Sequence, residues 1–130
     1  MIIKYLTVEN VLDLHEKILK NTKEDKELAP HTSLSSALHR IDDHITYDGL
    51  DDIHEIAALY GIAIAKGHCF NNGNKRTALV SMLTFLLLNG INIDVSNELI
   101  EEVMVEIATD QINKKQLTIW LKKHAHLSIS

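Results

Sequence analysis

The chain has 130 residues, of which 45% are apolar, with one proline, five glycines and one cysteine. We predict a single domain over residues 1–130, because this length and apolar content can close one core without disulfides or structural metals. The net charge of −5 argues against direct nucleic-acid binding, which needs clustered lysine and arginine. The lone Cys69, the lack of a secretory signal and the lack of a membrane-length apolar run indicate a cytoplasmic protein without a membrane segment.

Apolar residues at helical spacing predict two helices in the first third of the chain. Thr7 is placed to cap the first helix, which is expected to end near Asn21. Its apolar stripe comprises Val8, Val11, Leu12, His15, Ile18 and Leu19. The charged segment 22–31 contains the single proline and is predicted to be a loop. A second helix begins after Ser33 and is expected to end in the turn-forming residues 46–49.

The middle of the chain predicts a third and a fourth helix. Asp51 is expected in the first turn of the third helix, and Lys66-Gly67 is a sound stop signal for it. The fourth helix covers about residues 74–89 and is apolar on nearly every side. We therefore expect it to be the central helix around which the others pack.

Two further helices complete the prediction. Ser96 or Asp94 can cap the fifth helix, and Asn113 with Gln116 forms a capping box at the start of the sixth. No segment shows a convincing strand pattern. The fold class predicted from the sequence is therefore all-α, with six helices.

The residues with the clearest chemical potential lie between the third and fourth predicted helices. The exit of this segment is a helix N-terminus, where unpaired N–H groups and the helix dipole favour an anion. Asn72-Gly73-Asn74 favours turns in which consecutive amides point into one concavity. Lys75 and Arg76 oppose the dipole in the first helical turn, and a bound anion would relieve that unfavourable interaction.

Other side chains of the same segment have assignable roles. A histidine such as His68 can be neutral near pH 7 and can take a proton from a hydroxyl that attacks phosphorus. We expect Phe70 to point into the core and hold the segment in place. Cys69 is expected to be a small buried side chain. Lys66 could reach a phosphate, or it could simply be favoured by the dipole at a helix C-terminus.

The run from His68 to Thr77, His-Cys-Phe-Asn-Asn-Gly-Asn-Lys-Arg-Thr, resembles the Fic/Doc motif, His-x-Phe-x-(Asp/Glu)-(Gly/Ala)-Asn-x-Arg. The resemblance extends over almost the whole chain and is to the compact death-on-curing (Doc) type. It implies the all-α Fic/Doc fold, with His68 as the general base and Phe70 as the loop anchor. The residues that it implies for nucleotide phosphates are Asn71, Gly73, Asn74, Lys75 and Arg76.

Lys75 indicates the subclass within this resemblance. Fic enzymes that transfer AMP usually have glycine at this position, whereas the Doc type has lysine. The resemblance therefore implies a kinase toxin that uses ATP and Mg²⁺ and passes the γ-phosphate to a threonine of elongation factor Tu, which stops translation. It also implies a small antitoxin partner whose disordered tail folds onto the toxin. AMP transfer is the alternative that Lys75 disfavours.

Asn72 departs from the motif, because the family has a metal-binding Asp or Glu there. A neutral amide is a weaker Mg²⁺ ligand than a carboxylate. Asn72 could still ligate through its carbonyl, it could mark a weakened or inactive member, or it could be a substitution introduced to allow expression of a toxin. A catalytically weakened protein that acts by binding its antitoxin or target therefore stays open as an alternative.

Two remaining features carry weaker predictions. Ile45-Thr46-Tyr47-Asp48 lies where Fic-like folds place a flap that pairs with an extended target segment by strand addition. As a plain interhelical turn it needs no function. The histidine pairs His39 with His44 and His124 with His126 lack the companion ligands of a zinc site, so we interpret them as solvated or half-buried residues.

Overall fold

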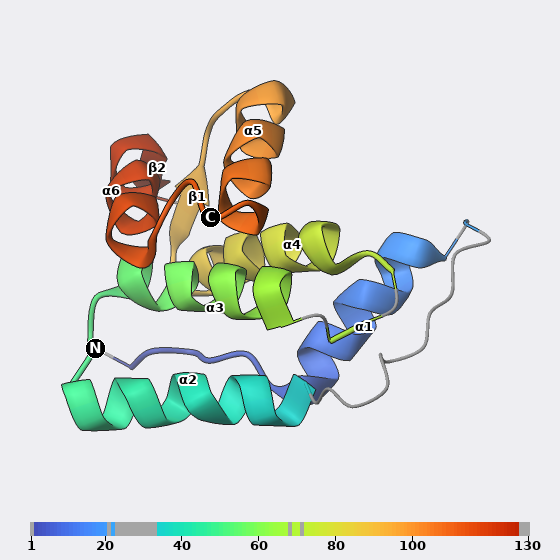
Figure 1. Cartoon of the computed structure of the whole chain (residues 1–130). Helices are drawn as coiled ribbons and strands as arrows, with labels where there is room; N and C mark the ends of the chain where they lie inside the picture. The colour runs from blue at the N-terminus through green and yellow to red at the C-terminus, as the bar shows by residue number, and fades with distance from the viewer. Residues whose placement is uncertain (1, 21, 23–33, 68, 71, 128–130) are drawn as a thin grey trace.

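The computed structural model describes residues 2–20, 22, 34–67, 69–70 and 72–127. Six helices and two short strands follow one another through these ranges (Figure 1). The helices are α1 (Val8–Leu19), α2 (Leu34–Asp48), α3 (Ile53–Gly67), α4 (Asn74–Leu88), α5 (Asn97–Ala108) and α6 (Lys114–His124), and the strands are β1 (Ile91–Ile93) and β2 (Ala125–Leu127). The predicted all-α fold class is confirmed. The loop predicted over residues 22–31 lies outside the described residues, except for Thr22.

Helices α3 and α4 pack along each other and share the centre of the fold (Figure 1). Helix α3 also contacts α2, α5 and α6, whereas α4 contacts α1, α5 and β1. Gly61 permits the close approach, because a Cβ atom there would lie 2.9 Å from Met82 Sδ. The apolar helix α4 is thus central as predicted, but it shares this position with α3 and leaves Leu87 and Leu88 exposed.

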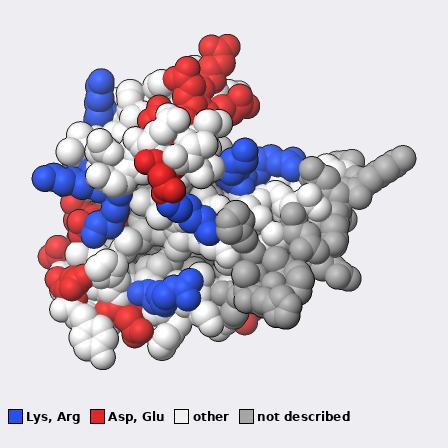
Figure 2. Space-filling view, viewed as in Figure 1, with Lys and Arg blue, Asp and Glu red and all other residues white. Residues whose placement is uncertain are grey.

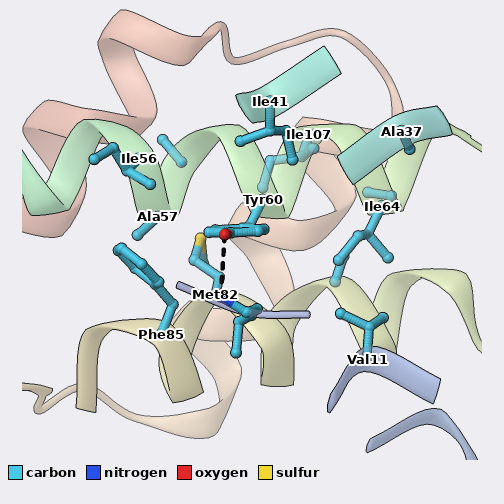
Figure 3. Close-up of a cluster of buried hydrophobic side chains, with 14 of the residues drawn as sticks. Val11, Ala37, Ile41, Ile56, Ala57, Tyr60, Ile64, Met82, Phe85 and Ile107 are labelled. Carbon is cyan, nitrogen blue, oxygen red and sulfur yellow. Dashed lines mark hydrogen bonds between the residues drawn. The ribbon is translucent and has the colours of Figure 1, made fainter. Parts of the chain in front are cut away.

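The core around Tyr60 ties the N-terminal segment to α3 (Figure 3). The ring of Tyr60 packs at a tilt against Phe85, with 5.0 Å between ring centroids. Its hydroxyl accepts a hydrogen bond from the backbone N–H of Leu6 at 3.1 Å. Burial raises the pKa of Tyr60 to about 12, so the ring stays neutral and can fill the core.

Capping interactions begin three of the helices where the sequence predicted them. Thr7 and Asn10 form a capping box at α1, and Asn113 and Gln116 form one at α6. At α5 the cap is Ser96, whose hydroxyl accepts from the N–H of Leu99. Side-chain caps satisfy N–H groups that the helix itself leaves unpaired.

Two short strands correct the expectation that the chain contains no strand. Strand β1 pairs antiparallel with β2 in the register Ile91 with Leu127, Asn92 with His126 and Ile93 with Ala125. Each strand has three residues, too few for alternation of apolar and polar residues to be recognised in the sequence. His126 accordingly lies in a strand rather than beside His124 on a helix.

The segment Ile45-Thr46-Tyr47-Asp48 corrects a second expectation. These residues form the last turn of α2, not a connecting turn. Gly49 adopts a left-handed conformation at φ +64°, and the N–H of Leu50 donates to the carbonyl of Ile45 at 3.0 Å, which is a Schellman ending that keeps the preceding residues helical. Strand addition at this segment would require the turn to unwind.

The histidines of α2 pair with carboxylates one helical turn later. His39 contacts Asp43 at 3.5 Å, and His44 contacts Asp48. Among the described residues no group of three or more His, Cys, Asp or Glu side chains is arranged to hold a metal ion. None of the helices in the described ranges is both long and apolar enough to cross a membrane.

Candidate active site

The candidate site lies in the connection from α3, which ends at Gly67, to α4, which begins at Asn74. His68 and Asn71 lie outside the described residues. Their predicted roles as general base and phosphate contact therefore stay predictions. The described part of the connection comprises Cys69, Phe70, Asn72 and Gly73.

Phe70 fixes the connection to the core. Its side chain is 2% exposed, as expected from the sequence. The ring stacks on His15 of α1, with 3.7 Å between ring centroids and 10° between ring planes. Cys69 is also buried, and this burial raises the pKa of its thiol. A buried thiol with a raised pKa is a poor nucleophile, in keeping with the expected structural role.

Asn74 holds the connection from its other end. The N–H of Phe70 donates to Asn74 Oδ1 at 3.0 Å, and Asn74 Nδ2 donates to the Phe70 carbonyl at 2.7 Å. This pair of bonds ties the backbone of Phe70 to the side chain of Asn74, four positions later. The side-chain amide of Asn74 thus has a scaffolding function in the structure, and its predicted contact with a phosphate stays a prediction.

Gly73 gives the start of α4 its particular geometry. It adopts φ +79°, in the left-handed region that favours glycine. A Cβ atom at this position would lie 3.3 Å from Leu19 Cδ2 and 3.6 Å from His15 Nε2, so the space is also limited. The N-cap residue Gly73 has no side chain with which to cap α4, and a helix N-terminus is a favourable place for an anion.

A pocket of about 540 Å³ opens at this helix start. Its lining residues are Ala65, Lys66, Asn72, Gly73, Asn74, Lys75, Arg76, Ala108 and Asp110. Five of the predicted phosphate-binding positions therefore line one pocket: Lys66, Gly73, Asn74, Lys75 and Arg76. Figure 2 shows Asp and Glu side chains gathered over α5 at the upper edge, with Lys and Arg side chains nearer the middle of the same face. The chain has a net negative charge, but Lys66, Lys75 and Arg76 make this pocket locally basic.

Lys66 and Asp110 form an ion pair in the wall of the pocket. Lys66 comes from the last turn of α3 and Asp110 from the connection between α5 and α6. Asp110 has φ +59°, a conformation that Asp and Asn tolerate better than most residues. Their side chains are 41% and 71% exposed, so the pair adds little stability. A phosphate in the pocket could compete with Asp110 for Lys66.

The side chains that line the pocket suit a bound anion better than a bound magnesium ion. Among the described residues that line the pocket, Asp110 has the only carboxylate, and it is paired with Lys66. Position 72, where the motif has an acid, offers the neutral amide of Asn72. Mg²⁺ prefers negatively charged oxygen ligands, so bound phosphates would have to supply most of the charge.

His15 contributes to the site in a way that the sequence analysis missed. Its ring is 2% exposed, and its Nε2 atom lies 2.8 Å from the backbone carbonyl oxygen of Asn72. The sequence placed His15 only within the apolar stripe of the first helix. A histidine on the buried face of an amphipathic helix was the available signal, because a buried polar group needs a partner.

Comparisons with known proteins agree with this geometry. The sequence pattern of the Fic/DOC family matches residues 5–86, which include α1, α3 and the connection that enters α4. The "Protein kinase doc" of Escherichia phage P1 is 29% identical over 120 residues, which cover 92% of this chain and 94% of that protein. The family match spans more than half of the chain, and the chain therefore belongs to the Fic/DOC family.

Proposed function

We propose that this protein is a Doc-type kinase that transfers the γ-phosphate of ATP to a hydroxyl of a target protein. The observation that carries the proposal is the start of α4 at a left-handed Gly73, with the cations Lys66, Lys75 and Arg76 lining one pocket. Family membership and the kinase named among the relatives support the same reaction class.

The electrostatics of the pocket support binding of a polyphosphate. Lys75 and Arg76 lie in the first turn of α4, where positive side chains oppose the helix dipole. An anion at the helix start interacts favourably with both the dipole and these side chains. A nucleotide triphosphate supplies several negative charges, so it suits this pocket, which is lined by Lys66, Lys75 and Arg76, better than an uncharged substrate.

The transfer step follows from this placement. The oxygen of the target hydroxyl attacks the γ-phosphorus, the bond from that phosphorus to the β,γ-bridging oxygen breaks, and ADP leaves. We assign acceptance of the hydroxyl proton to His68 as general base. Asn71, Gly73, Asn74, Lys75 and Arg76 would hold the phosphates, which keeps the reacting phosphorus in line with the hydroxyl.

The target and the control of activity follow from the resemblance to Doc-type toxins. We propose a threonine of elongation factor Tu as the acceptor and a block of translation in the cytoplasm as the consequence. We also propose a small antitoxin as the partner that neutralises the protein. A second function, binding of the antitoxin or target without effective catalysis, is favoured by the neutral Asn72 at the acid position of the motif.

Mass spectrometry of elongation factor Tu separates these functions. The purified protein is incubated with elongation factor Tu and Mg²⁺, using ATP labelled at the γ-phosphate in one reaction and at the α-phosphate in another. Gain of phosphate with the γ label supports the kinase. Gain of AMP with the α label would support AMP transfer instead, and no modification would support the binding protein.

Neutralising Asp110 is expected to tighten ATP binding. Asp110→Asn removes the negative charge from the pocket wall and releases Lys66 to the phosphates, while asparagine still tolerates φ +59°. The dissociation constant for ATP should fall about two- to fivefold at low ionic strength, as expected for an exposed charge. Isothermal titration calorimetry measures it, with Asp94→Asn, outside the pocket, as the matched control. If the two variants bind ATP with equal affinity, Asp110 does not compete with the phosphates for Lys66.

A further inference from the structure

His15 is a buried polar side chain that the proposed reaction does not use. It lies on α1, and its ring is 2% exposed. One face of the ring stacks on Phe70 and its Nε2 atom lies 2.8 Å from the carbonyl oxygen of Asn72. One side chain of α1, a helix far from this connection in the sequence, thus contacts two residues of the connection between α3 and α4.

The contact with Asn72 is a directional hydrogen bond. A backbone carbonyl oxygen can only accept, so Nε2 carries the hydrogen and donates it. The accepting carbonyl belongs to the peptide group that leads into Gly73, the residue with φ +79° that begins α4. The bond therefore fixes the orientation of the peptide group that joins Asn72 to Gly73, directly before α4.

Packing around Gly73 adds a second constraint from the same helix. A Cβ atom on Gly73 would lie 3.6 Å from both Cδ2 and Nε2 of His15, and 3.3 Å from Leu19 Cδ2. Helix α1 is therefore in close contact with the connection at Phe70, Asn72 and Gly73. Packing alone would be served by an apolar side chain, because burying an imidazole without a hydrogen bond is unfavourable.

We propose that His15 is a positioning residue for the phosphate-binding loop. By donating to Asn72 and stacking on Phe70, it holds the peptide before Gly73 so that the first amides of α4 stay directed at the pocket. The inference rests on the proposed function in one respect, namely that the pocket binds the phosphates of ATP. Its structural content, a loop conformation that depends on the Nε2 hydrogen bond, can be measured without catalysis.

Three variants separate positioning from general stability. His15→Gln keeps a donor at about the reach of Nε2, whereas His15→Phe keeps a ring to stack on Phe70 but has no donor. Val11→Ala is the matched control, because Val11 is fully buried on the same helix and its truncation destabilises the core without removing the loop bond. For each variant we would measure the melting temperature, the affinity for ATP and hydrogen exchange of the Phe70 and Thr77 amides, which donate to Asn74 Oδ1 and to the Gly73 carbonyl.

His15→Phe is expected to weaken ATP binding about tenfold, the effect of one lost hydrogen bond, and to speed amide exchange in the loop. His15→Gln should restore the affinity to within about threefold of the original protein by the same reasoning. Val11→Ala should lower the melting temperature with little change in affinity. The proposal is overturned if affinity follows melting temperature across all three variants, or if His15→Phe binds ATP normally.

The same measurements distinguish this proposal from the proposed function. A protein that binds ATP in a His15-dependent manner but transfers no phosphate would disprove the kinase and leave the positioning intact. If the original protein binds no ATP, the rates of amide hydrogen exchange decide whether His15 positions the loop. Faster exchange at Phe70 and Thr77 in His15→Phe, with recovery in His15→Gln, supports the positioning, and unchanged exchange contradicts it.

Discussion

Replacement of His68 by alanine is expected to lower the rate of phosphate transfer by about 100- to 10,000-fold, the usual contribution of a positioned general base. Without the imidazole, the attacking hydroxyl would have to lose its proton to water while it forms the bond to phosphorus. The measurement is a single-turnover assay with saturating γ-labelled ATP and elongation factor Tu. Saturation with nucleotide separates the chemical step from binding.

The affinity for ATP supplies the control for this variant. The cations assigned to the phosphates, Lys66, Lys75 and Arg76, line the pocket from α3 and α4 and remain in His68→Ala, so the dissociation constant should change little. His39→Ala is a suitable control substitution, because His39 lies on the exposed face of α2. An unchanged transfer rate in His68→Ala would show that the base assignment is wrong.

Local interactions explain why much of the fold could be predicted. Thr7 with Asn10, and Asn113 with Gln116, satisfy helix N–H groups with side chains only three residues away. Such contacts depend on sequence spacing and not on tertiary structure. The helix starts were therefore predictable, and so was the grouping at the start of α4 of the pocket residues Gly73, Asn74, Lys75 and Arg76, which are adjacent in sequence.

Features that depend on distant partners could not be predicted in the same way. His15 and Asn72 are 57 positions apart, so a stripe of apolar spacing gave no sign of their hydrogen bond. The pairing of β1 with β2 joins Ile91 to Leu127 and likewise leaves no local pattern. The Schellman ending at Gly49 was a local signal, but turn-forming residues before it suggested that the helix ended earlier.

Asn74 illustrates the limit of transferring a motif position to a role. The resemblance implies that this residue holds phosphate, and it lines the pocket as expected. The structure adds that its side chain bonds to both backbone groups of Phe70. A loss of activity on mutation of Asn74 would thus combine a lost ligand contact with a distorted loop. The motif alone does not reveal the second contribution, although the two residues are only four positions apart.

Replacement of Asn72 by aspartate is expected to weaken ATP binding without Mg²⁺ and to strengthen it with Mg²⁺. A carboxylate at position 72 adds negative charge to the pocket in which we propose that phosphates bind, so without Mg²⁺ the affinity for ATP should fall several-fold. With Mg²⁺ present, the carboxylate is a stronger ligand than the amide. The affinity for ATP and the rate of transfer should then rise about tenfold or more, the range of a charge-assisted interaction. Calorimetry and the γ-label assay, each with Mg²⁺ and with EDTA, measure these effects.

One hydrogen bond that holds the loop is independent of the side chain at position 72. His15 donates to the backbone carbonyl of residue 72, a bond that does not depend on the side chain, and an acid near the start of α4 is favoured by the helix dipole. Asn72→Ser, which changes the side chain without adding charge, is the matched control. If Asn72→Asp and Asn72→Ser respond alike to Mg²⁺, position 72 is not a metal ligand in this protein. A rise in transfer confined to Asn72→Asp would instead show that the amide is what limits turnover, because the remaining parts of the site would then be competent for phosphate transfer.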